Sequence, residues 1–264
     1  MSLVFSAVTP HPPLLIPNIG KEKTEKLIKT QTALEQLEQS LYISKPHIIV
    51  VITPHEGIYN NTFVINAHTH FQSNFHDFGD IETQKEWAGT PSLAAKIQHN
   101  TREEKISTRL ISNEKLEHGA SVPLFFLTDH LSNIQILPIG YSKSDPKSHL
   151  QFGKILKEVI MESDKRIALL ASGDLSHRLT TNSPGGFHKD GQKFDNQIIE
   201  MLETRNTVGI AQMDKELVAN ADDCGYRSIL ITLGVLQNMN YSFKNLCYEY
   251  PFGVGYLTGE FLFD

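Results

Sequence analysis

The sequence has few cysteines, no long apolar run and no excess of basic residues. Its two cysteines, Cys224 and Cys247, are too few for a disulfide framework and fit a reducing compartment, so we expect a cytoplasmic protein. No apolar run is long enough to cross a membrane, and we expect no signal peptide or membrane partner. The formal net charge of -6, without a Lys/Arg block, argues against nucleic acid as a partner.

The chain has 264 residues, and its hydrophobic content of 40% is ordinary for a globular protein. Short β-branched runs alternate with helical patterns along it. Strands are predicted at residues 3–8, 47–52, 62–67, 134–139 and 166–171, and helices at 20–41, 91–99, 119–130, 148–163, 193–203 and 224–237. Residues 12–17, rich in proline, are predicted to be extended, and residues 56–88 to be largely irregular. This alternation predicts one α/β domain over residues 1–264.

Two of the predicted strands end in the same tripeptide. Thr9-Pro10 precedes His11, and Thr53-Pro54 precedes His55. Proline ends a strand because it has no amide hydrogen for the sheet, and the β-α-β order predicts that the two strands are parallel. Ligands of open α/β sheets bind outside the carboxyl ends of the strands, so both imidazoles should reach one cleft. Either a metal site or two histidines bonded to backbone would fit.

Two other segments carry histidines that could transfer protons. His118 begins a predicted helix beside Gly119, and His177 follows a buried strand with Asp174 and Ser176 available to orient its ring. A serine-hydrolase interpretation is disfavoured, because no G-x-S-x-G elbow is present.

Asp223 and Cys224 precede the helix predicted at 224–237. A carboxylate at a helix start can be only a cap, but added to two histidines it would complete the 2-His-1-carboxylate set of Fe(II) oxygenases. Cys224 is the rival ligand and would favour Zn or Cu.

Six short motifs occur in the order found in one enzyme family. They are HPPLLIP from His11, TPHEG from Thr53, EHGASVPL from Glu117, SGDLSHRL from Ser172, DDCGYRS from Asp222 and YEYPFGVGY from Tyr248. With these motifs the chain resembles the class III extradiol dioxygenases, in particular their LigB-like catalytic subunit and the AmmeMemoRadiSam branch that contains the Memo proteins. The resemblance spans nearly the whole chain and implies one LigB-like, phosphorylase-like α/β domain with a central mixed, largely parallel sheet flanked by helices.

The resemblance also implies roles for individual residues. His11 and His55 match the metal-binding histidines, and Asp223 stands where glutamate is common in this branch, so it is the expected third ligand with Cys224 as its rival. His177 and His118 match the catalytic histidines. The implied activity is Fe(II)-dependent opening of a small aromatic diol with O2, with a homo-oligomer compatible with the sequence. Two alternatives stay open: a Memo-like metal-binding protein without ring cleavage, and a Zn-dependent hydrolase-type enzyme.

Overall fold

The β-branched runs form strands of one mixed sheet in the computed structural model, which describes the chain apart from residues 1 and 58. The strands are β1 (Leu3–Thr9), β2 (Ile48–Thr53), β3 (Phe63–Asn66), β4 (His70–Ser73), β5 (Glu86–Gly89), β6 (Thr108–Ile111), β7 (Lys115–Leu116), β8 (Gln135–Gly140), β9 (Ile167–Ser172), β10 (Tyr241–Glu249) and β11 (Tyr256–Phe263). Their order is β10-β11-β1-β9-β2-β8-β5-β4-β7, with β3 pairing β8 and β6.

The centre of the sheet is parallel. Strands β1 and β2 both pair in parallel with β9, which lies between them, and β2 also pairs in parallel with β8. Strand β11 runs antiparallel to β1 and to β10 at the other side of the sheet. The predicted mixed, largely parallel α/β architecture is therefore confirmed, and the carboxyl ends of β1, β9 and β2 share one edge.

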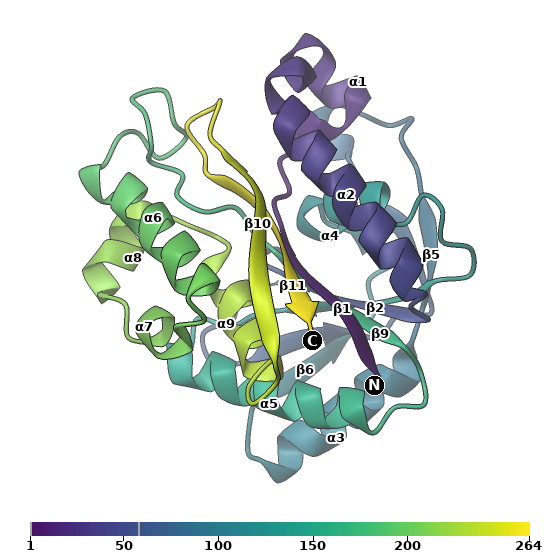
Figure 1. The fold of residues 1–264 in the computed structure, drawn as a ribbon. Helices are drawn as coiled ribbons and strands as arrows, with labels where there is room; N and C mark the ends of the chain where they lie inside the picture. Colours follow the sequence, from purple (N-terminus) through teal and green to yellow (C-terminus); the bar gives the residue numbers. More distant parts are fainter. Residues whose placement is uncertain (1, 58) are drawn as a thin grey trace.

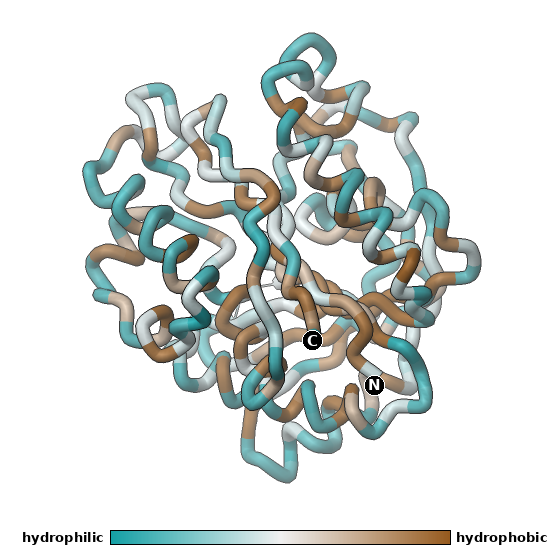
Figure 2. Tube along the Cα trace, in the orientation of Figure 1, coloured by the Kyte–Doolittle hydropathy of each residue, from teal (hydrophilic) through white to brown (hydrophobic). Residues whose placement is uncertain are grey.

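The helices cover both faces of this sheet (Figure 1). They are α1 (Pro17–Gly20), α2 (Ile28–Ser44), α3 (Pro91–Glu103), α4 (His118–Leu127), α5 (Pro146–Met161), α6 (Lys189–Glu203), α7 (Thr207–Ala211), α8 (Lys215–Ala221) and α9 (Tyr226–Val235), with 3-10 helices at Pro13–Leu15, Lys21–Leu27 and His76–Phe78. Strand β2 is buried on both faces: Ile49 and Val51 pack with residues of α2 and α4, while Val50 and Ile52 pack with residues of α5 and α9. The hydropathy colouring shows the same apolar centre (Figure 2).

Some local predictions were wrong. Residues 12–17 were expected to be extended, but Pro13–Leu15 forms a 3-10 helix and Pro17 begins α1. Proline is tolerated at the first positions of a helix, where its missing N–H would have no partner anyway. The segment 56–88 holds β4 and β5 besides the predicted strand, and α7 and α8 were not predicted.

Candidate metal centre

His11, just after β1, is fixed by Ser172 at the end of β9 and by Asp174 just beyond it. Its backbone N–H donates to Asp174 Oδ1 at 2.9 Å, and its Nδ1 lies 2.9 Å from Ser172 Oγ. The Ser172 hydroxyl donates its hydrogen to the carbonyl oxygen of Gly119, so Ser172 Oγ accepts from His11 Nδ1–H. This network assigns the tautomer of His11 and leaves Nε2 unprotonated, which is the form that binds a metal ion.

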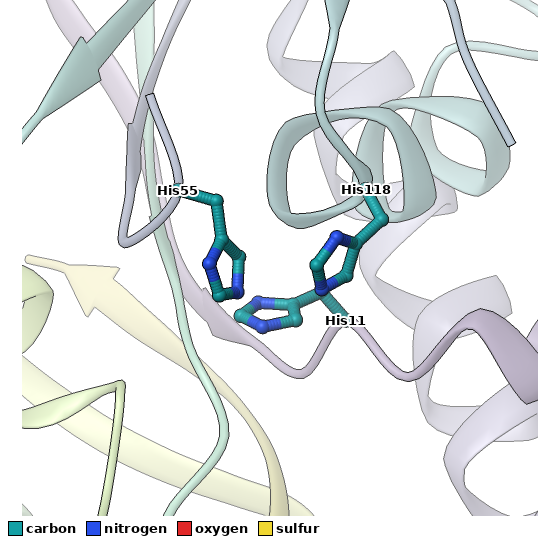
Figure 3. A group of neighbouring side chains, drawn as sticks. All are labelled: His11, His55 and His118. Atoms are coloured by element: carbon teal, nitrogen blue, oxygen red, sulfur yellow. The ribbon is translucent and has the colours of Figure 1, made fainter. Parts of the chain in front are cut away.

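Three imidazoles meet at this edge of the sheet. The ring centroids of His11 and His55 are 5.2 Å apart, those of His11 and His118 5.3 Å, and the His55 and His118 rings stack at 4.3 Å. One nitrogen from each ring lies within 4.8 Å of the other two. Figure 3 shows the three side chains, from the ends of β1 and β2 and the start of α4, pointing toward one another. The predicted convergence of His11 and His55 is present in the structure.

The start of α4 is held against the end of β2 by Glu117. This residue caps α4, because its carboxylate accepts from the N–H groups of Gly119 and Ala120. The same carboxylate accepts from Thr53 Oγ1 at 2.6 Å. A Cβ on Gly119 would lie 2.6 Å from Thr53 Oγ1 and 3.0 Å from the His55 ring, so only glycine lets the helix start come this close. Glycine here is what allows His118 to reach His55.

The environment keeps these imidazoles neutral. Burial lowers the pKa of His11 well below its ordinary value, and a positive charge on His55 or His177 would lower it further. Partial desolvation also lowers the pKa of the exposed His55, and burial, with help from His11, lowers that of His118 to about 3. Neutral imidazole is the form that ligates a metal, so the three rings need lose no proton before they bind an ion at neutral pH.

A second group of donors lies on the other side of His11. Cys224 Sγ is 3.6 Å and Asp174 Oδ2 is 4.0 Å from His11 Nε2, and the three atoms form a group of metal-ligand type. The backbone brings them together: the N–H groups of Cys224 and Gly225 both donate to Asp174 O, and Asp174 N–H donates to Sγ. Burial raises the pKa of the Cys224 thiol well above its ordinary value, so the thiol is protonated at neutral pH.

Asp223, the expected third ligand, lies outside both of these groups. Asp222 takes a left-handed conformation (φ 55°) at the end of α8, and Asp223 then accepts from the N–H of Tyr226 at 2.7 Å, as a helix cap does. Burial raises its pKa to about 6. Its neighbours are Tyr226 and Arg227, with which it lines a cavity of about 500 Å³.

His177 lies beside the cluster but outside the two donor groups. It follows Asp174, which contacts His11, by three residues, and a positive charge on its ring would lower the pKa values of His11 and His55. Its backbone N–H donates to Ala221 O at 3.0 Å, while its buried Nδ1 has no hydrogen-bond partner among the described residues. A buried ring nitrogen without a partner is exceptional, and the imidazole of His177 is therefore a candidate for proton exchange with a ligand.

Asp174 is the donor whose place sequence reasoning missed. It was expected only to orient the ring of His177, yet it lies against the backbone and Nε2 of His11. The signal was present: Asp174 follows β9 by two residues, as His11 follows β1 and His55 follows β2. The rule that selected the histidines selects this carboxylate as well.

Comparison with known proteins gives one family match and several distant relatives. The model of the family described as "Catalytic LigB subunit of aromatic ring-opening dioxygenase" matches residues 6–259. A Clostridium acetobutylicum protein, CA_C1420, is 29% identical over 97% of this chain. The match covers only 57% of the length of that relative. A 4,5-DOPA dioxygenase extradiol of Mirabilis jalapa is 27% identical over 67% of each chain.

A MEMO1 family protein of Methanosarcina mazei is 23% identical over 77% of this chain and 78% of its own. The solved structure of the uncharacterized protein JW3007 from Escherichia coli K12 superposes with a TM-score of 0.71, covering 97% of this chain and 99% of that one at 16% identity. That likeness concerns the fold. Within the part of the chain that the structure describes, no helix is long and apolar enough to cross a membrane.

Proposed function

Because the chain belongs to the family of the catalytic LigB subunit of aromatic ring-opening dioxygenases, we propose that it is an Fe(II)-dependent extradiol-type dioxygenase that opens a catechol-like ring with O2. The observation that carries the proposal is the meeting of three neutral imidazoles beside His177 at the carboxyl edge of the sheet. The relative named as a DOPA extradiol dioxygenase supports the reaction class.

The donor set fits a divalent ion. His11, His55 and His118 are the proposed ligands, because each offers a nitrogen within 4.8 Å of the others. Three protein ligands leave coordination positions open for substrate, as in catalytic metal sites generally. Asp174 is the proposed carboxylate of the site: it holds the backbone of His11 and places a carboxyl oxygen 4.0 Å from Nε2.

When bound, Fe(II) would supply Lewis acidity toward the two hydroxyls of the diol and the electron exchange that O2 requires. The remaining roles belong to the protein. The imidazole of His177, which is only partly buried, accepts a hydroxyl proton from the diol and returns it later in the reaction. Ser172 keeps a proton on Nδ1 of His11, so that Nε2 stays available as a donor.

The test is anaerobic reconstitution of the protein with Fe(II), followed by an oxygen-electrode screen of catechols. We expect catechol-dependent O2 uptake and a ring-opened product. His177→Ala should abolish turnover while the protein keeps its metal. Loss of metal in that variant would make His177 a ligand, and the absence of O2 uptake with any catechol by the iron-loaded protein would contradict the proposal.

A second candidate function rests on Cys224. Its Sγ lies 3.6 Å from His11 Nε2, and a thiolate there would favour Zn or Cu over iron. The MEMO1 family relatives make a metal-binding protein without ring cleavage the second candidate. Protein purified with stoichiometric Zn or Cu, and inactive toward catechols after iron loading, would favour this candidate.

The proposed partners are therefore a small aromatic diol and O2. The proposed location is the cytoplasm, where both free cysteines, Cys224 and Cys247, would stay reduced.

A further inference from the structure

Asp195 is a buried carboxylate that neither the proposed ligand set nor the proposed proton transfer uses. It lies on α6 with no exposed surface, among the apolar residues Phe194, Ile198 and Leu202 of the same helix face. None of the ion pairs in the described part of the chain involves it. Burial raises its pKa to about 7, a sign that the site penalises its charge. A residue that costs stability here needs a compensating use.

Both oxygens of Asp195 hold defined partners. Oδ1 accepts from the backbone N–H of Ser176 at 2.8 Å, and Oδ2 accepts from the hydroxyl of Tyr248 at 2.7 Å. The pKa of Tyr248 is raised, first by burial and then by Asp195, so the phenol keeps its proton and donates it to this bond. A Cβ on Gly255 would lie 2.2 Å from Oδ2, so glycine makes room for the carboxylate.

Ser176 is the residue just before His177, and the segment around it is bonded to the turn between β10 and β11. Leu175 N–H donates to Gly255 O at 2.8 Å, and Gly255 N–H donates to Ser176 O at 2.9 Å. Two residues of the YEYPFGVGY motif thus have a structural role here: Tyr248 bonds to Asp195, and Gly255 bonds to this segment. Asp195 contributes the side-chain bond to the amide of Ser176 itself.

We propose that Asp195 is a positioning residue, which through the Ser176 amide holds the segment of Asp174 and His177 at the metal centre. The proposal rests on the proposed function, because it assigns the purpose of that position to proton transfer by His177. Among the described residues, Asp195 makes its hydrogen bonds to Ser176 and Tyr248 and none to the imidazoles, so it acts through the backbone. Tyr248 serves the carboxylate in the same way, by fixing the oxygen that does not face Ser176.

The test compares Asp195→Ala with Asp195→Asn. Asparagine keeps an oxygen that can accept from Ser176 and an amide that can bond to Tyr248, whereas alanine removes both bonds. Ile198→Ala is the matched control, because it removes buried atoms from the same face of α6 without touching Ser176. Tyr248→Phe is a milder variant, at a partly exposed position, should the alanine variant not fold.

The first measurement needs no substrate. We expect amide hydrogen exchange in the peptide 172–180 to be about tenfold faster in Asp195→Ala, because the Ser176 amide loses its hydrogen bond. Exchange there should also be clearly faster in Tyr248→Phe. Asp195→Asn and Ile198→Ala should exchange there as wild type does. Unchanged exchange in the alanine and phenylalanine variants would overturn the proposal, whatever the activity of the enzyme.

The second measurement is kcat and KM per metal-loaded site. We expect kcat of Asp195→Ala to fall about 100-fold with KM little changed, since misplacement of a reacting group by about 1 Å costs that much. Asparagine should restore kcat to within about fivefold of wild type, and Ile198→Ala should lower only stability. Equal losses in the asparagine and alanine variants would overturn the positioning role. Faster exchange in a protein that cleaves no catechol would refute the proposed function and leave the anchoring of the segment in place.

Discussion

His11 stands between two groups of side chains of metal-ligand type, and the fold builds these groups differently. On one side, His55 is exposed and His118 partly exposed, and within the described residues neither ring makes a hydrogen bond. On the other side, Asp174 is buried, and both residues already accept hydrogen bonds. Asp174 Oδ1 accepts from His11 N–H, and Cys224 Sγ accepts from Asp174 N–H. The difference suggests that the imidazole side is prepared for an exchangeable ion, while the acid–thiol side mainly fixes His11.

The largest effect should come from His11, because it belongs to both sides. His11→Ala should lower metal affinity more than about 100-fold, beyond the loss typical of residues that only support a ligand. Competitive titration with a chelating dye would measure it. His130→Ala, at a histidine whose side chain is 70% exposed, is the control. Wild-type affinity in His11→Ala would refute the metal centre.

The next largest effect on metal affinity should distinguish the imidazole side of His11 from the acid–thiol side. His118→Asn should weaken Fe(II) binding about 10- to 100-fold, because it removes a free nitrogen donor, whereas Cys224→Ser should change it only a few-fold. The same titration, run on both variants, gives the ratio. The reverse ratio would move the ion to the acid–thiol side and favour the second candidate function.

Acidification should lower the free energy of unfolding of the metal-free protein, because the folded state keeps these imidazoles neutral. The pKa of His118 is about 3 in the folded chain and ordinary, near 6.5, when unfolded, so the unfolded state takes up the proton first as pH falls below 6.5. Folding stability is therefore lost on acidification, by about 2 kcal/mol at pH 5 from this residue. Urea unfolding at pH 7 and pH 5 should show a smaller loss for His118→Asn than for wild type. Equal losses would mean that His118 protonates freely in the folded state.

The smallest effect concerns the tautomer of His11. Ser172→Ala removes the acceptor for Nδ1–H, and metal affinity should fall about tenfold while the fold is kept. Isothermal titration of metal into both proteins would measure the change. An unaltered affinity would show that the Ser172 hydroxyl is not needed to hold the tautomer of His11.

The strand pattern was sufficient to predict the α/β sheet and the meeting of His11 and His55. Parallel strands end at the same edge of a sheet, so residues that directly follow two such strands lie close together. It could not separate Asp223 from Asp174. The left-handed turn at Asp222, which directs Asp223 to the start of α9, has no distinct sequence signal. Asp195 could have been found, since it shares a helix face with Ile198 and Leu202 at helical spacing.

The most direct test of the imidazole-side metal centre is X-ray absorption at the iron edge of protein loaded anaerobically with Fe(II). Coordination by His11, His55 and His118 predicts a first shell of nitrogen and oxygen atoms, with multiple scattering from three imidazole rings and no sulfur. A sulfur atom in that shell, lost in Cys224→Ser, would contradict this account and assign the ion to the acid–thiol side of His11.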